Sequence, residues 1–160
     1  MILFSHGLGC SVDGGRYWGE QWASHGFVVI HIQHPGSDES VWKDAERPAR
    51  ALRRAANTEQ FKARVADVKF VLDELQRRQR AGDALAVRAD LARIGMSGHS
   101  FGAITTQTLA GQRFDVPRRL QAQADALADE RLRAFIAFSP SARTDDAVAQ
   151  FNAITRPFFS

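Results

Sequence analysis

Cysteine is almost missing from this 160-residue chain, which has only Cys10. One cysteine excludes an internal disulfide and leaves the redox compartment open. Long apolar runs are also missing: a run such as residues 27–30 is far shorter than the roughly 20 residues that span a bilayer, so no transmembrane segment is expected. No charged leader with a cleavage site precedes the first apolar residues, and no signal peptide is recognised.

Neither sign of charge is in large excess. The chain has 21 basic and 18 acidic residues, a net charge of +3, and no basic tail or stripe, so nucleic acid is not an expected partner. The four arginines within residues 47–54 are interpreted as a solvated helix face rather than an anion site. A composition of 44% hydrophobic and 24% charged residues is typical of a globular protein, and we expect one domain over residues 1–160.

No histidine follows position 99, so all five histidines precede Ser100. His31 and His34 fall on opposite faces of a predicted strand, so they do not begin a three-ligand metal site. We therefore expect no bound metal. The histidines at the end of this strand are interpreted as ordinary strand-end residues.

Strand-like and helix-like segments alternate, which predicts a mostly parallel sheet with helices on both faces. The predicted strands are residues 2–4, 27–33, 91–96, 134–138 and 154–160. The predicted helices are residues 16–25, 46–56, 58–80 with Thr58 as cap, 101–110 and 116–131.

Apolar spacing indicates how two of these helices pack. Trp18 and Trp22 are one turn apart, which favours core packing over an aromatic substrate cage. Helix 58–80 has an apolar stripe that we expect to lie against the sheet, formed by Phe61, Val65, Val68, Leu72 and Leu75. Residues 35–57 form a long connection, in which Val41 and Trp42 are predicted either to line a substrate site or to dock on the domain surface.

The sequence Gly98-His99-Ser100-Phe101-Gly102 lies between a predicted strand and a predicted helix. This G-x-S-x-G pattern in that context is typical of a nucleophile elbow, a sharp turn that holds the serine hydroxyl out at the edge of the sheet. The flanking glycines allow strand and helix to approach closely. We therefore predict that Ser100 is a nucleophile.

A second motif, His6-Gly7-Leu8-Gly9, directly follows the first strand. A serine hydrolase needs two fixed N–H donors for the oxyanion, one after the nucleophile and one from the loop after an early strand. The backbone amides of Phe101 and Leu8 are the candidates. A dinucleotide-binding loop is the rival interpretation, but Val12 stands where its third glycine is needed.

Cys10, beside this loop, is interpreted as a packing residue rather than a nucleophile.

Together with residues 23–29 and 34–38, these motifs resemble the platelet-activating-factor acetylhydrolase and dienelactone-hydrolase-like branch of the α/β-hydrolases. The resemblance implies an α/β-hydrolase fold and an esterase or lipase-like serine hydrolase that cleaves a small-molecule or lipid ester through an acyl-enzyme and needs no cofactor. It places His6, Gly7, Gly98, His99 and Gly102 in supporting positions around the nucleophile.

In this fold the triad follows the chain order serine, acid, histidine. Asp145 is a candidate acid, although its position after Thr144 also suits the first turn of a capped helix. We otherwise expect the acid and histidine beyond residue 160, a hydrolase domain truncated at both ends, and little or no turnover by these 160 residues. The alternative is a non-catalytic hydrolase fragment that lacks a base. The ester, the compartment and the oligomeric state are left open.

Overall fold

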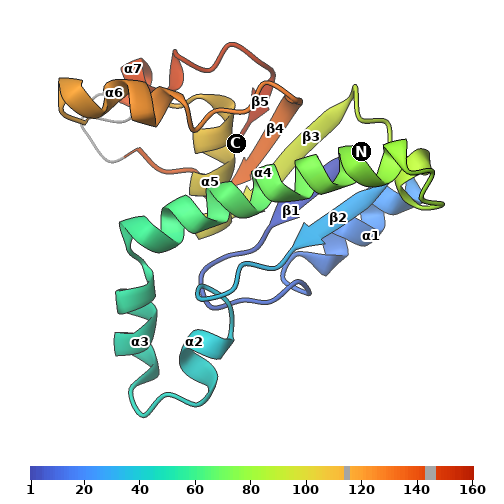
Figure 1. Cartoon of the computed structure of the whole chain (residues 1–160). Coiled ribbons are helices and arrows are strands. Elements are labelled where there is room, and N and C mark those ends of the chain that lie inside the picture. The colour runs from blue at the N-terminus through green and yellow to red at the C-terminus, as the bar shows by residue number, and fades with distance from the viewer. Residues whose placement is uncertain (114–115, 143–146) are drawn as a thin grey trace.

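Five strands form one sheet in the computed structural model, which describes residues 1–113, 116–142 and 147–160. The strands are β1 (Ile2–Ser5), β2 (Val29–Ile32), β3 (Ile94–His99), β4 (Leu132–Phe138) and β5 (Phe158–Phe159). Their order is β2-β1-β3-β4-β5, and each neighbouring pair is parallel (Figure 1). The predicted α/β class with a parallel sheet is confirmed.

Helices connect these strands, as parallel neighbours require. They are α1 (Arg16–Ser24), α2 (Ser40–Lys43), α3 (Pro48–Ala55), α4 (Thr58–Arg80), α5 (Phe101–Ala110), α6 (Arg118–Asp125), α7 (Ala147–Phe151) and the short 3₁₀ helix η1 (Ala86–Arg88). Within the described ranges, none of them is both long enough and apolar enough to cross a bilayer.

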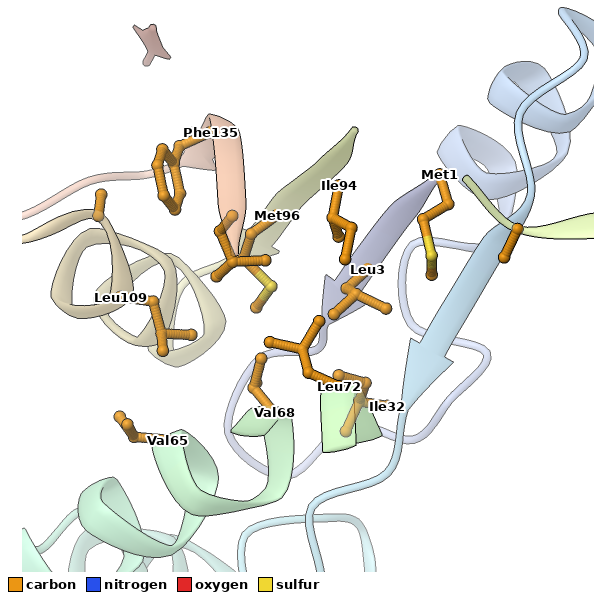
Figure 2. Packing of buried hydrophobic residues seen from close by; sticks show 13 residues of the cluster. Met1, Leu3, Ile32, Val65, Val68, Leu72, Ile94, Met96, Leu109 and Phe135 are labelled. Carbon is orange, nitrogen blue, oxygen red and sulfur yellow. The ribbon is translucent and has the colours of Figure 1, made fainter. Parts of the chain in front are cut away.

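Alternating side chains of β1 pack against helices on the two faces of the sheet. Leu3 belongs to the main core with Val68 and Leu72 of α4, and Figure 2 shows these side chains gathered between sheet and helix. Phe4 faces the other way, with its ring 5.9 Å from the ring of Trp18 in α1. The prediction of helices on both faces is therefore confirmed, as is the packing role of Trp18.

The apolar stripe of α4 packs as predicted, but the predicted cap is wrong by one residue. Val65, Val68 and Leu72 are buried in the core. The N-cap is Asn57, which is extended at φ −124° and accepts a hydrogen bond on Oδ1 from the Gln60 amide at 2.9 Å. Thr58 is already helical, so asparagine takes the position in which a side-chain oxygen satisfies a free helical amide.

Several predicted elements have other bounds in the structure. Helix 16–25 ends at Ser24, and helix 46–56 is limited to α3. Strand 91–96 is displaced to β3, because residues 91–93 form a turn before it.

Strand 27–33 is reduced to β2, and Phe27 is 48% exposed because this strand is at the edge of the sheet and pairs with β1 over Val29–Ile32 alone. Helix 116–131 is limited to α6. Strand 154–160 is limited to the two residues of β5.

Helix α5 approaches the sheet closely at two glycines. A Cβ atom on Gly98 would overlap the Gly102 carbonyl, and one on Gly102 would overlap the Ser5 carbonyl of β1. Both obstacles are backbone atoms, which cannot rotate away as a side chain can. Glycine at these two positions therefore sets how closely α5 packs against β1 and β3.

Replacing Gly102 tests this close approach. We expect Gly102→Ala to lower the free energy of unfolding by about 1–3 kcal/mol or more, because α5 must move away from β1. The matched control is Gly95→Ala in β3, where an added Cβ meets its nearest neighbours at ordinary contact distances of 3.7 to 3.8 Å. Urea unfolding should show the control unchanged or more stable by about 0.5–1 kcal/mol. Equal stabilities of the two variants would contradict the packing argument.

Candidate functional site

Ser100 occupies the turn between β3 and α5 in a conformation that residues other than glycine rarely adopt, with φ 55° and ψ −114°. The turn is fixed because the Ser100 amide donates to the Phe138 carbonyl at 3.0 Å, and the Ser100 carbonyl accepts from the Ala103 amide at 2.9 Å. The residue is exposed. Strain of this kind at an accessible polar residue is characteristic of functional sites.

The loop after β1 lies directly beside this turn. A Cβ atom placed on Gly7 would be 3.5 Å from Cβ of Ser100 and 3.4 Å from Nδ1 of His99. The same point lies 3.6 Å from Sγ of the half-buried Cys10. The fold thus brings together the two motifs that lie more than ninety positions apart in the printed sequence.

Two backbone amides near the turn have no acceptor of their own. Phe101 is the first residue of α5, so its amide has no partner within the helix, and the positive end of the helix dipole lies there. The half-buried Leu8 is in the loop after β1, and its amide makes no hydrogen bond within the described part of the chain. Neither amide therefore has a hydrogen-bond acceptor among residues 1–113, 116–142 and 147–160.

His6 supports the loop from beneath. Its imidazole is buried, and Nε2 accepts a hydrogen bond from the His34 amide at 3.2 Å, so the proton is on Nδ1, which donates to the Gly7 carbonyl at 2.7 Å. Burial lowers the pKa of His6. Both nitrogens are therefore engaged in fixing backbone, and His6 has no free nitrogen to accept the proton of Ser100.

A second group of polar side chains lies behind the loop. His34 is buried, its Nδ1 donates to Oδ2 of Asp67 at 2.8 Å, and its Nε2 accepts from the Ser5 hydroxyl at 2.9 Å. Burial lowers the pKa of His34 to about 4, so the ring is neutral near pH 7. This serine, histidine and aspartate have the connectivity of a triad, but Ser5 is fully buried and a substrate cannot reach it.

The sequence analysis missed this group and the arginine that joins it, Arg64. One signal was available: Arg64 is three residues after Phe61 and four before Val68, so it falls on the apolar face of α4. A charged residue on such a face is rarely left without polar partners. For His34 and Asp67 no local signal exists, since their contact joins positions 33 residues apart.

The structure does not test the candidate acid, and the histidine was expected beyond residue 160. Asp145 is outside the described residues. The Ser100 hydroxyl has no hydrogen-bond partner among the residues that are described. His99 is exposed at the end of β3, with its ring 6.3 Å from that of Trp18.

Trp42 of α2 contacts the loop after β1. This contact does not decide between the two roles predicted for Trp42, which are lining a substrate site and docking on the domain surface. Its indole Nε1 donates to the Gly9 carbonyl at 2.7 Å, and the side chain is still partly exposed. A Cβ atom on Gly9 would also crowd Leu52 of α3. Residues 35–57 therefore dock on the loop that carries Leu8, at the edge of the sheet where Ser100 lies.

Two surface hollows lie away from Ser100. One of about 330 Å³ is lined by α3 and the residues before it, including the exposed Arg47, Arg50 and Arg54. The other, of about 390 Å³, lies between α1 and β2. No cluster of three or more metal-ligating side chains occurs among residues 1–113, 116–142 and 147–160.

Comparison with known proteins does not identify a family for this chain. No protein-family model matches the sequence, and no curated protein matches it either.

The buried histidines predict a pH dependence of stability. His34 has a pKa of about 4 in the folded chain against 6.5 when exposed. Below pH 6.5 the unfolded chain binds a proton that the folded chain excludes, so stability falls with pH. Between pH 7 and pH 5 this loss amounts to about 2 kcal/mol.

Urea unfolding at both pH values checks this expectation. His34→Gln should remove most of the difference, whereas replacing the exposed His25 by glutamine should leave it intact. If the free energy of unfolding of the His34→Gln variant changes with pH as much as that of the original chain, His34 is not the titrating group.

Proposed function

We propose that this chain carries the nucleophile and the oxyanion-binding amides of a serine hydrolase that cleaves carboxylic esters. The observation that supports the proposal most strongly is the conformation of Ser100: an exposed hydroxyl at positive φ, between a parallel strand and a helix, beside a glycine loop. Ser139 is also exposed and at positive φ, so the position of Ser100 between a strand and a helix, beside the glycine loop, is what distinguishes it.

The reaction begins with attack of Ser100 Oγ on the ester carbonyl carbon. The serine proton passes to a general base, a carbon–oxygen bond forms, and the carbonyl oxygen becomes negative. The Leu8 and Phe101 amides donate hydrogen bonds to this oxygen, and the N-terminus of α5 adds its dipole. The tetrahedral species then expels the alcohol, which takes the proton back from the base.

Water completes the cycle. The base removes a proton from water, and the hydroxide attacks the acyl carbon. The bond to Ser100 Oγ then breaks, the base returns the proton to Oγ, and the acid is released from the regenerated serine. Loss of one oxyanion donor typically lowers the rate about 100-fold to 1,000-fold, so the positions of the two amides should dominate the activity.

The general base is the part of the machinery that we do not assign to a histidine of this chain. Both nitrogens of His6 and of His34 are engaged in the fold. His25 is bonded to its own helix through the Gln21 carbonyl at 2.8 Å.

The His31 ring packs 5.0 Å from the Phe4 ring, and His99 is exposed at the end of β3. None of the five histidines, all of which lie in the described part of the chain, is therefore hydrogen-bonded to the Ser100 hydroxyl. The lack of a bonded histidine favours the second candidate function, a hydrolase-like fragment that binds ligands without turnover.

Covalent labelling separates the two candidates. We expect a fluorophosphonate to modify Ser100 at least about tenfold faster than any other serine, because two amides and a helix dipole stabilise the negative transition state. Mass spectrometry of the treated chain should locate the adduct on Ser100, and Ser100→Ala should remove it.

Ser139 offers a matched control for this experiment. It is also exposed and has a positive φ of 63°, and it follows the neighbouring strand β4. Ser139→Ala should leave labelling unchanged. A folded chain that is not labelled on Ser100 would support the non-catalytic fragment, and labelling that follows Ser139 would contradict the assignment of the nucleophile.

A further inference from the structure

Arg64 of α4 is fully buried at 0% exposure, although arginine is among the residues least often found inside proteins. Burying a charge costs several kcal/mol unless hydrogen bonds or an opposite charge offset the loss of water. No carboxylate within the described ranges lies at ion-pair distance from the guanidinium. Burial lowers the pKa of Arg64 to about 10, so the group is still charged at neutral pH.

Neutral groups from three segments satisfy this cation. Nη1 donates to the Ser37 hydroxyl at 2.7 Å, in the loop after β2. Nη2 donates to the Ser5 hydroxyl at 3.0 Å and to the His6 carbonyl, at the end of β1. Nε donates to Thr105 Oγ1 of α5 at 3.4 Å. Arg64 therefore links α4, β1, α5 and the loop after β2 at one point behind Ser100.

Arg64 also contacts one of the two residues that we assign to the oxyanion. Its guanidinium carbon lies 4.9 Å from the centre of the Phe101 ring, a cation–π distance. The Phe101 ring is buried, so this contact is protected from water. The side chain of the residue that supplies one amide is thus packed on the cation.

The other amide is oriented through a short relay of hydrogen bonds. Arg64 fixes the His6 carbonyl, and the His6 ring fixes the Gly7 carbonyl at 2.7 Å, which also accepts from the Cys10 amide at 3.2 Å. In a trans peptide the N–H points opposite to the preceding C=O. The Leu8 N–H therefore points away from the His6 ring and the Cys10 amide, and no acceptor in the described part of the chain is bonded to it.

The charge of Arg64 is only weakly offset by its surroundings. Asp67 is the acidic side chain whose charge acts on it, but this carboxylate is 34% exposed and bonded to His34. Solvent screens an exposed carboxylate more than it screens a buried cation. Arg64 is thus a buried positive charge next to the Phe101 ring.

We propose that Arg64 is a positioning residue for the oxyanion. It fixes the position of the His6–Leu8 loop relative to Phe101, and its charge stabilises a negative oxygen bound between them. This inference rests on the proposed function, since it assumes that an anionic oxygen forms beside Ser100. It adds to that function a residue on α4 that is far from the two motifs in sequence.

Phenylboronic acid binding to the full chain tests the proposal without turnover. Ser100 Oγ adds to the trigonal boron, the serine proton passes to the buffer, and the tetrahedral boron carries the negative charge and the hydroxyl oxygens. Boron-11 nuclear magnetic resonance detects this species, and Ser100→Ala should abolish it. We expect Arg64→Met to weaken binding about 10-fold to 100-fold, since both the loop geometry and the charge change.

Two further variants separate positioning from general stability. Arg64→Lys keeps the charge but cannot bridge Ser5, Ser37 and His6 at once, so binding should weaken only about 3-fold to 10-fold. Leu72→Ala removes a core side chain from the same helix and destabilises the fold without touching this network. It should leave boronate binding within about twofold of the original chain under folding conditions.

The outcomes are distinct. Boronate that forms on Ser100 of the original chain and binds equally well to the Arg64→Met variant would overturn the role of Arg64 alone. Equal losses in Leu72→Ala and Arg64→Met would overturn it as well, because a loss of stability would then explain both. If Arg64→Met does not fold, Arg64→Lys decides, and unchanged binding overturns the proposal. Absence of boronate from the original chain overturns the proposed function and this inference together.

Discussion

Contact between backbone and backbone at Gly98 and Gly102 is the constraint on which the rest of the site depends. Since no side chain separates α5 from β1 and β3, the chain must pass from strand to helix within one residue, and Ser100 takes the resulting positive φ. The same closeness brings the first turn of α5 beside the loop after β1. The exposed position of Ser100 and its closeness to the glycine loop are thus both consequences of this backbone packing.

A layer of polar side chains, rather than of apolar core residues, lies in the interior beneath this turn. Arg64, His6, His34 and Ser5 are all buried and satisfy one another or the backbone. Replacing such a network by packed apolar residues is often neutral or stabilising, so stability alone does not explain why it is there. Its hydrogen bonds end on the backbone of the glycine loop, which is consistent with a role in fixing peptide orientation.

Local patterns predicted the five strands, the longer helices and the turn at Ser100, because strand period, helix period and glycine positions are each defined within a few neighbouring residues. The short helices α2 and η1 were not predicted. The length of the edge strand was predicted less well. Phe27 is of a residue type common in strands, but β2 lies at the edge of the sheet, where only β1 pairs with it, and Phe27 is left exposed. The network around Arg64 could not be derived, since its hydrogen bonds join α4 to residues 27 to 59 positions away. Neither the hydrophobic periodicity of a segment nor a short motif carries information about contacts between residues so far apart in the sequence.

We infer that Ser100 presents its hydroxyl to two backbone amides, one from the loop after β1 and one from the first residue of α5. An experimental structure of the chain after fluorophosphonate treatment tests it most directly. The account predicts phosphorus bonded to Ser100 Oγ, with the phosphoryl oxygen about 2.7–3.1 Å from the amide nitrogens of both Leu8 and Phe101. A phosphoryl oxygen directed into solvent, or bound by neither amide, would contradict it.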